Sequence, residues 1–143
     1  IPKTEQEQLI KARRGQGFFR LNLEKTEKGC RLTGVTDKQF LIAGHIKPWR
    51  VSDNFEKLDG NNGLLLSPHV DKLFDKGWIS FSDDGRVLCA NESIEGLMKT
   101  WGLDPGKKMG GFNEFQKKYL NYHRSEIFRR PQTTDLQPNR IVR

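Results

Sequence analysis

Residues 41–81 read LIAGHIKPWRVSDNFEKLDGNNGLLLSPHVDKLFDKGWISF, and they decide the fold that we predict for the chain. Leu41–His45 is a short apolar run, which predicts a strand that ends at His45. A polar segment follows and ends in the cluster of glycines and asparagines at 60–63, whose residues suit a turn. Leu64–Leu66 then predicts a second, buried strand, so the two strands would form a hairpin joined by a long polar loop.

A helix is predicted directly after the second strand. Ser67 is a residue type that caps helix starts, and Pro68 suits the first helical position. The pattern continues to about Lys76, and Gly77 is placed where a glycine commonly ends a helix. The apolar positions of this helix, three and four residues apart, are Val70, Leu73 and Phe74. The segment is therefore expected to run strand, loop, strand, helix.

Two aspartates, Asp71 and Asp75, are four residues apart in this helix. That spacing puts both carboxylates on one side of the helix, where they would repel each other by a few tenths of a kcal/mol. A divalent cation would reverse the sign of this interaction, because carboxylate oxygens are ligands that Mg²⁺ prefers. The histidine at the end of the first strand and the two helical carboxylates therefore indicate a metal-assisted site.

The run His45–Pro48, the asparagine that opens the second strand and the helix with its two aspartates resemble the HNH endonuclease family. The resemblance implies an α+β fold with a ββα-metal core, extended here by N- and C-terminal helices and a second small hairpin. It implies His45 as the general base on water, Asn62 as the residue that braces the loop, and Asp71 and Asp75 as ligands of Mg²⁺ or Mn²⁺. Cations that flank these groups, and that we expect to contact phosphates, are Lys47, Arg50, Lys72 and Lys76.

The segments HIKPW, NGLLLS and FDKGWISF are similar to those of HNH cleavage modules in bacterial restriction endonucleases. This resemblance implies a DNA endonuclease that hydrolyses phosphodiester bonds of double-stranded DNA to 5′-phosphate and 3′-hydroxyl ends. It also implies an upstream recognition domain in the same chain, a homodimer for cutting both strands, and a bacterial cytoplasmic location. A neutral imidazole suits the reaction, since its unperturbed pKa near 6.5 allows it to accept a proton at physiological pH.

Two departures from the family pattern leave alternatives open. The residue before the base histidine commonly binds the metal, but here it is Gly44, so water or His69 is the candidate replacement. Many relatives hold a structural zinc with two CxxC pairs, whereas this chain has only Cys30 and Cys89, and we expect no structural zinc. The missing ligand favours one alternative, a DNA-binding module that has lost cleavage. The other alternative is a nuclease toxin of the same fold.

Composition bounds these interpretations. With 143 residues we predict one domain over 1–130, with its catalytic core at about 29–90, and a flexible tail over 131–143. The opening Ile1 indicates a fragment of a longer protein. The net charge of +7 favours a polyanionic partner such as nucleic acid. No apolar run approaches the roughly 20 residues of a membrane span, so no membrane partner is expected.

Hydrophobic periodicity predicts further helices over residues 5–14, 18–28, 93–101 and 113–129. Gly15 and Gly17 are expected to separate the first two, and Ser93 is expected to cap the third. Residues 78–81 and 86–90 predict a second hairpin across an Asp-Gly turn. The apolar residues predicted to pack in the core from these helices include Phe18, Phe19, Leu21, Leu23, Trp101 and Phe115. His123 is interpreted as an ordinary surface or interface histidine.

Overall fold

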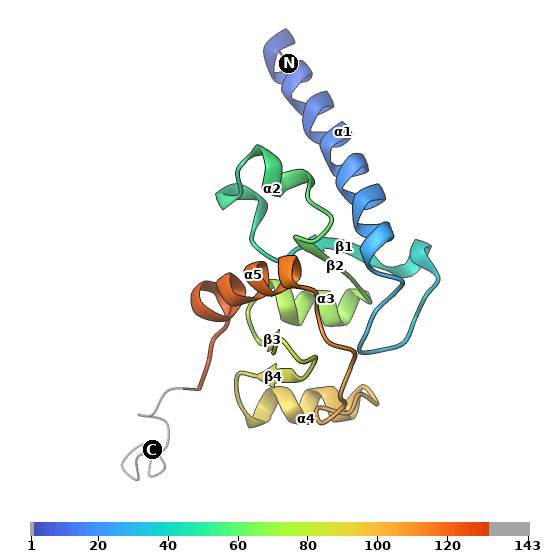
Figure 1. Cartoon of the computed structure of the whole chain (residues 1–143), viewed down its shortest axis with the longest axis vertical. Coiled ribbons are helices and arrows are strands. Elements are labelled where there is room, and N and C mark those ends of the chain that lie inside the picture. Colours follow the sequence, from blue (N-terminus) through green and yellow to red (C-terminus); the bar gives the residue numbers. More distant parts are fainter. Residues whose placement is uncertain (1, 132–143) are drawn as a thin grey trace.

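The computed structural model describes residues 2–131, so the predicted flexible tail lies outside the described residues except for Pro131. The chain combines helices with two short hairpins (Figure 1). The helices are α1 Lys3–Thr26, α2 Asn54–Leu58, α3 Pro68–Asp75, α4 Glu92–Thr100 and α5 Glu114–Tyr122. The strands are β1 Ile42–His45, β2 Gly63–Leu66, β3 Ile79–Phe81 and β4 Val87–Cys89. Short helical turns are η1 Lys38–Phe40, η2 Trp49–Val51 and the π-helical η3 His123–Ile127.

The predicted hairpin is present and is followed by the predicted helix. β1 pairs antiparallel with β2, with Ile42 opposite Leu66 and His45 opposite Gly63. Pro68 occupies the first turn of α3, as expected, and Gly77 follows the helix with a φ of 78°. A glycine suits that position because a side chain would be strained at positive φ. The α+β class and the ββα core are thereby confirmed.

Helices cover both faces of the hairpin. All four residues of β2 are buried, and β2 contacts both α1 and α3. Because successive side chains of a strand point to opposite faces, one face of β2 packs on α1 and the other on α3. The α3 residues that face the hairpin and core are Val70, Leu73 and Phe74, each at most 4% exposed. The hairpin is thus held between two helices, and only one of them, α3, is close to it in sequence.

The N-terminal prediction of two helices is wrong, because α1 runs without a break from Lys3 to Thr26. A glycine in a helix costs only about 1 kcal/mol relative to alanine, and tertiary packing of the C-terminal half outweighs that. Phe19 and Leu23 are fully buried there, as predicted. Phe18 and Leu21 are about 60% exposed, so their predicted core packing is wrong. The N-terminal half of α1 projects from the rest of the molecule (Figure 1).

Two predicted helix caps also differ from the structure. The Ser67 hydroxyl does not cap α3, but shares a hydrogen bond of 2.7 Å with the Thr33 hydroxyl. Asn91, and not Ser93, caps α4 by accepting a hydrogen bond from the backbone N–H of Ile94. Asn91 and Ser93 are both of capping type, and sequence alone does not choose between them. Ser67 does precede α3, but its hydroxyl is bonded to Thr33, a residue distant in sequence.

The second hairpin and the C-terminal helices complete the fold. β3 and β4 pair antiparallel, with Ile79 opposite Cys89, and confirm the second hairpin. Trp101 and Phe115 are 39% and 66% exposed, so their predicted burial is wrong. His123 is not a surface histidine, since it is 1% exposed and bonded to the Ser80 hydroxyl and the Phe74 carbonyl. Within residues 2–131, no helix is both long and apolar enough to cross a membrane.

Candidate active site

His45 ends β1, and one of its ring nitrogens is held by the long loop between the strands. Nε2 lies 2.8 Å from the carbonyl oxygen of Lys57 in α2. A carbonyl can only accept a hydrogen bond, so Nε2 carries the proton in the neutral ring and Nδ1 carries the lone pair. Within residues 2–131, no hydrogen-bond partner is found for Nδ1. His45 therefore presents a nitrogen that can accept a proton.

The imidazole of His45 also stacks on an aromatic ring of α1. Its centroid lies 3.7 Å from that of Phe19, with 11° between the planes. The histidine is half-buried, and burial lowers its pKa below the ordinary value of 6.5, while the Lys57 carbonyl opposes part of that shift. The ring is therefore neutral at physiological pH, which is the state that can act as a base.

Asn62 lies just before β2 and binds the backbone of the loop at several points. Its side-chain oxygen accepts the Lys47 N–H at 2.8 Å, and its side-chain nitrogen donates to the Glu56 carbonyl at 3.0 Å. The residue is completely buried. These contacts tie the start of the loop and the helix α2 within it to the start of β2. The same loop supplies the Lys57 carbonyl that is bonded to His45, so Asn62 helps to hold that carbonyl in place.

Asp71 of α3 places its carboxylate against the backbone of Gly44. A Cβ at position 44 would lie 2.9 Å from Oδ1 of Asp71, so the carboxylate fills the space that a side chain there would take. Burial, together with the charge of Asp75, raises the pKa of Asp71 from 3.8 to about 6. The carboxylate is thus held next to the residue that precedes His45, where burial and the neighbouring Asp75 disfavour its ionisation.

The two aspartates suit a hard divalent cation. Mg²⁺ is usually bound through one or two carboxylates, with water and substrate phosphates completing its shell. Asp75 is one helical turn from Asp71 and its side chain is 68% exposed, so it is accessible to solvent and substrate. Among residues 2–131, no group of three or more His, Cys, Asp or Glu residues is arranged to hold a metal. The donor set therefore fits a cation that shares its shell with substrate, and does not fit one enclosed by protein.

His45 and Asp71 reach the end of β1 from opposite faces of the hairpin. The ring of His45 packs on Phe19 of α1, whereas Asp71 of α3 lies against Gly44. This follows from strand geometry, because consecutive residues alternate in direction. Gly44, which Asp71 approaches, and His45 are consecutive residues, so their Cα atoms are about 3.8 Å apart across one peptide bond. A group at the edge of the hairpin can therefore be approached from both sides.

A comparison with family models adds independent evidence. Residues 30–82 match the family described as HNH endonuclease. These residues form an HNH domain. The match runs through β1, β2, α3 and β3 and ends before β4, so α1, α4 and α5 lie outside it. No curated protein matches the chain. The family is one of nucleases, and the match of this segment supports nuclease activity.

The four cations predicted near the HNH site differ in their surroundings. Lys47 donates to both carboxylate oxygens of Glu56 at 2.9 Å, so its charge is already paired. Lys76 is half-exposed, with Nζ 3.9 Å from a carboxylate oxygen of Asp75. Arg50 and Lys72 are exposed. The structure therefore leaves Arg50, Lys72 and Lys76 accessible to a phosphate, and Lys47 engaged in an ion pair.

His69, the candidate replacement for the ligand missing at Gly44, points elsewhere in the HNH domain. Its ring makes an edge contact with Trp101, with the centroids 4.9 Å apart. Two residues along a helix are about 200° apart around its axis, so His69 and Asp71 lie on nearly opposite sides of α3. The space beside Gly44 is filled by Asp71 itself.

Two features of the HNH site were not found by sequence reasoning. Phe19 was recognised as a core residue, yet nothing in its helical spacing indicated that it stacks on His45. Lys57 contributes its backbone carbonyl, which leaves no trace in the side-chain pattern. The short helix α2 that carries Lys57 did have a signal, since Asp53 and Glu56 form a capping box.

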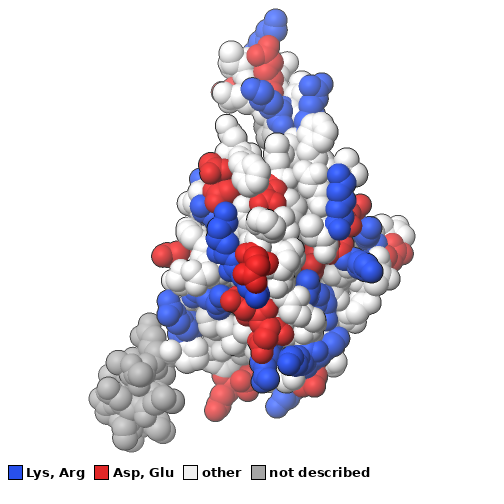
Figure 2. Space-filling view, in the orientation of Figure 1, with Lys and Arg blue, Asp and Glu red and all other residues white. Residues whose placement is uncertain are grey.

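The surface around the HNH domain carries charges of both signs. Figure 2 shows lysines and arginines interspersed with aspartates and glutamates over the visible face. The net charge of +7 is therefore not gathered into one basic region on that face.

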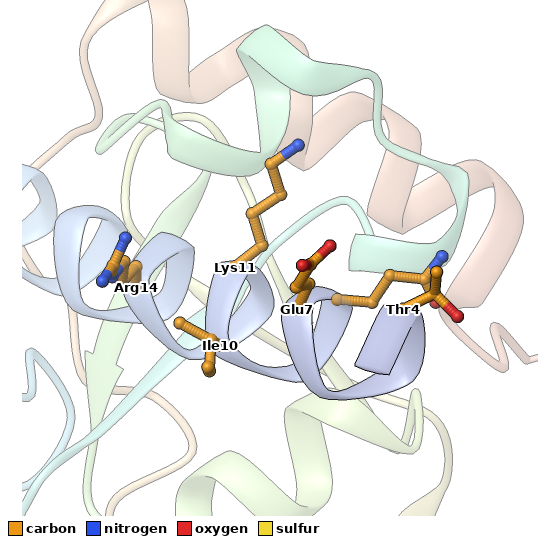
Figure 3. A pocket seen from close by; sticks show the side chains of 6 residues that line it. Thr4, Glu7, Ile10, Lys11 and Arg14 are labelled. Carbon is orange, nitrogen blue, oxygen red and sulfur yellow. The ribbon is translucent and has the colours of Figure 1, made fainter. Parts of the chain in front are cut away.

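A pocket on α1 is formed by that helix alone and contains no predicted site residue (Figure 3). Its lining residues are Thr4, Glu7, Gln8, Ile10, Lys11 and Arg14.

Proposed function

We propose that the HNH domain is a divalent-metal-dependent endonuclease that hydrolyses phosphodiester bonds of double-stranded DNA to 5′-phosphate and 3′-hydroxyl ends. The observation that supports this most directly is the arrangement at the end of β1. There His45 keeps one ring nitrogen unprotonated because the Lys57 carbonyl holds the other, and the Asp71 carboxylate lies against the preceding residue. The base is thus at one residue of β1, and the cation ligand packs against the residue before it from the other face of the hairpin.

In this mechanism His45 activates the nucleophile. Nδ1 removes a proton from a water molecule while the water oxygen forms a bond to phosphorus. The bond from phosphorus to the 3′ oxygen of the DNA breaks, and that oxygen takes up a proton from solvent. The Lys57 carbonyl stabilises the imidazolium that forms, because Nε2–H remains bonded to it throughout. Asn62 keeps the loop, and therefore this carbonyl, in place.

Asp71 and Asp75 would hold the cation, and the solvent-accessible side of Asp75 leaves room for phosphate oxygens. When bound, Mg²⁺ or Mn²⁺ would act as a Lewis acid that stabilises negative charge on the scissile phosphate. Asp71 must ionise to bind it, and its pKa of about 6 allows this at neutral pH. Arg50, Lys72 and Lys76 would hold neighbouring phosphates without reading the base sequence.

The decisive experiment is nicking of supercoiled plasmid in the presence of Mg²⁺ or Mn²⁺. His45→Ala should lower the cleavage rate by about 10²–10⁴-fold, the usual contribution of a general base. His69→Ala is the matched control, since its ring contacts Trp101 on the other side of α3, and it should cleave at the wild-type rate. Binding of DNA by both variants, measured in EDTA, should equal that of the wild type.

Other outcomes favour other functions. DNA binding without cleavage in any divalent metal would favour a binding module on an HNH scaffold. Equal cleavage by the wild type and His45→Ala would remove the histidine from the mechanism.

Cleavage products should be ligatable without treatment by a kinase, since 5′-phosphate ends are substrates for DNA ligase. Ends that require phosphorylation first would contradict the proposed bond cleavage.

The wider role is proposed from resemblance. Its motifs favour the cleavage module of a restriction enzyme in the bacterial cytoplasm, joined to an upstream recognition domain. Cutting both strands requires two active sites, which favours a homodimer on DNA. Sedimentation with a duplex of defined length would test this: one copy per cleaved duplex would contradict the dimer. A neighbouring gene for an inhibitor of the nuclease would favour the toxin alternative instead.

A further inference from the structure

Helix α1 lies outside the segment that matches the HNH family, yet it contacts the centre of the proposed site. The match begins at residue 30, and α1 ends at Thr26. The contact is made by Phe19, which is completely buried. Its ring stacks on His45 with the planes only 11° from parallel. A residue 26 positions before the histidine therefore forms one wall of its environment.

The fit between Phe19 and His45 depends on Gly63. In the hairpin register Gly63 is the partner of His45, so the two residues lie side by side on the face that α1 covers. A Cβ at position 63 would lie 2.5 Å from Cζ of Phe19, which is closer than real Cβ contacts. The absence of a side chain at Gly63 thus allows the phenyl ring to reach the imidazole.

Two contacts fix the imidazole in different ways. The Lys57 carbonyl defines the direction of Nε2, but rotation of the ring about that hydrogen bond would still be possible. The Phe19 ring lies parallel to the imidazole at 3.7 Å and defines its plane. Together they determine where the lone pair of Nδ1 points.

We infer that Phe19 is a positioning residue of the nuclease reaction, which holds the plane of His45 so that Nδ1 faces the attacking water. The inference rests on the proposed function of His45 as the base. It adds that α1 is part of the active site, because packing of this helix on the hairpin places the Phe19 ring that orients His45. A domain limited to residues 30–82 would contain His45 and lack the ring that orients it.

The test replaces Phe19 by leucine, which keeps an apolar side chain and removes the ring. Phe19→Leu should lower kcat roughly tenfold or more with little change in KM, because misplaced catalytic groups slow the reaction without weakening substrate binding. The chain has three histidines, so their ring protons can be assigned by NMR with single variants. The His45 Hε1 signal should lose the shift caused by the stacked phenyl ring, and its titration midpoint should rise towards 6.5 as burial is reduced.

Three control variants separate positioning from general destabilisation. Leu23→Ala removes a fully buried side chain one turn further along the same face of α1, and should destabilise the fold without moving the His45 signal. Phe18→Leu makes the same chemical change at an exposed neighbour and should leave kcat unchanged. Gly63→Ala should reproduce the effect of Phe19→Leu by displacing the ring, whereas Gly17→Ala, with open space around it, should not.

The outcomes distinguish the two proposals. Wild-type kcat and an unchanged His45 titration in Phe19→Leu would overturn the positioning role while leaving His45 as the base. A loss of kcat equal to that of Leu23→Ala, with no specific change in the His45 signal, would overturn it as well. No cleavage by the wild type, combined with a clear change in the His45 signal in Phe19→Leu, would overturn the proposed nuclease function and the catalytic part of this inference with it.

Discussion

Asp71 shows how a single residue can be unfavourable for folding and useful for function. Its carboxylate is half-buried against Gly44, and its pKa of about 6 means that the folded chain resists its ionisation. The unfolded chain ionises it near 3.8, so the folded state binds the proton more strongly between these values. Above pH about 6 the negative charge therefore lowers the stability of the folded state when no cation is present.

Asp71→Asn should raise the free energy of unfolding at pH 7.5 in EDTA by about 1–2 kcal/mol. One pKa unit corresponds to about 1.4 kcal/mol, and solvent around the half-buried group screens part of the shift. Urea unfolding followed by circular dichroism measures this. At pH 4 the gain should be much smaller, because the wild-type carboxyl group is then protonated. Destabilisation of the variant at pH 7.5 would contradict the prediction.

Divalent metal should reverse the order of stabilities. Mg²⁺ or Mn²⁺ should raise the Tm of the wild type, since a ligand that binds only the folded state stabilises it, and should leave Asp71→Asn nearly unchanged. Asp75→Asn is the matched comparison on the exposed position one turn later. It should stabilise the metal-free protein by only a few tenths of a kcal/mol, through loss of the repulsion with Asp71. Equal metal responses in all three proteins would exclude these aspartates as ligands.

At the scale of elements, α1 contains a local weakness that packing overcomes. Gly15 and Gly17 interrupt the helical pattern in the sequence, yet the helix continues through them to reach Phe19 and Leu23. A Cβ at Gly17 would meet nothing within 4 Å, and one at Gly15 would meet only a methyl group of Leu58 at 3.9 Å. Neither glycine is needed for space, so each represents a cost in chain entropy alone.

Gly15→Ala combined with Gly17→Ala should therefore raise the free energy of unfolding by about 1–2 kcal/mol, because each alanine reduces the conformational entropy of the unfolded chain. Thermal unfolding at fixed pH measures the effect. Gly60→Ala is the opposite control, because a Cβ there would collide with the backbone of Asn22 in α1. That variant should be destabilised. A lower Tm for the double alanine variant would show that α1 needs flexibility at these positions.

At the scale of the whole molecule, His123 links parts of the chain that are far apart in sequence. Its ring is bonded to Ser80 of β3 and to the carbonyl of Phe74 in α3, and stacks on the Phe74 ring with the centroids 3.8 Å apart. Burial, partly opposed by the Phe74 carbonyl, lowers its pKa to about 4. The second hairpin, α3 and η3 are thus joined through a histidine that must stay neutral.

A fall in pH should therefore destabilise the folded state through protonation of His123. The unfolded state protonates this residue near 6.5 and the folded state near 4, so the unfolded state binds more protons between these values. This group should lower the free energy of unfolding by on the order of 3 kcal/mol as the pH falls from 6.5 to 4. Asp71 acts in the opposite direction over part of the range and reduces the net loss.

His123→Gln isolates the contribution of the histidine, because Asp71 is common to both proteins. The variant should be less stable than the wild type at pH 7, where it loses packing and hydrogen bonds, but its stability should fall much less between pH 6.5 and 4. Urea unfolding at half-unit intervals of pH gives both slopes. Parallel pH profiles for the two proteins would show that acid acts through other groups.

Much of the core could be predicted because its signals are local. The strands at His45 and Leu64–Leu66, the proline that starts α3 and the glycine after it each act within a few residues. Periodicity indicates which helix face is apolar, but not whether a partner exists to cover it. That is why Phe19 was predicted correctly while Phe18, Trp101 and Phe115 were not: the latter face solvent although their spacing is equally helical.

The sequence by itself determined the ββα order and its candidate residues, since turn chemistry, alternation and helical spacing are properties of neighbouring residues. Only the tertiary structure decided how those residues are used. It placed Asp71 against Gly44, oriented His45 through the carbonyl of Lys57, and laid Phe19 on its ring. These contacts join segments 12 to 27 positions apart. They form because burying both faces of the hairpin is favourable, and no short-range pattern specifies which side chains then meet.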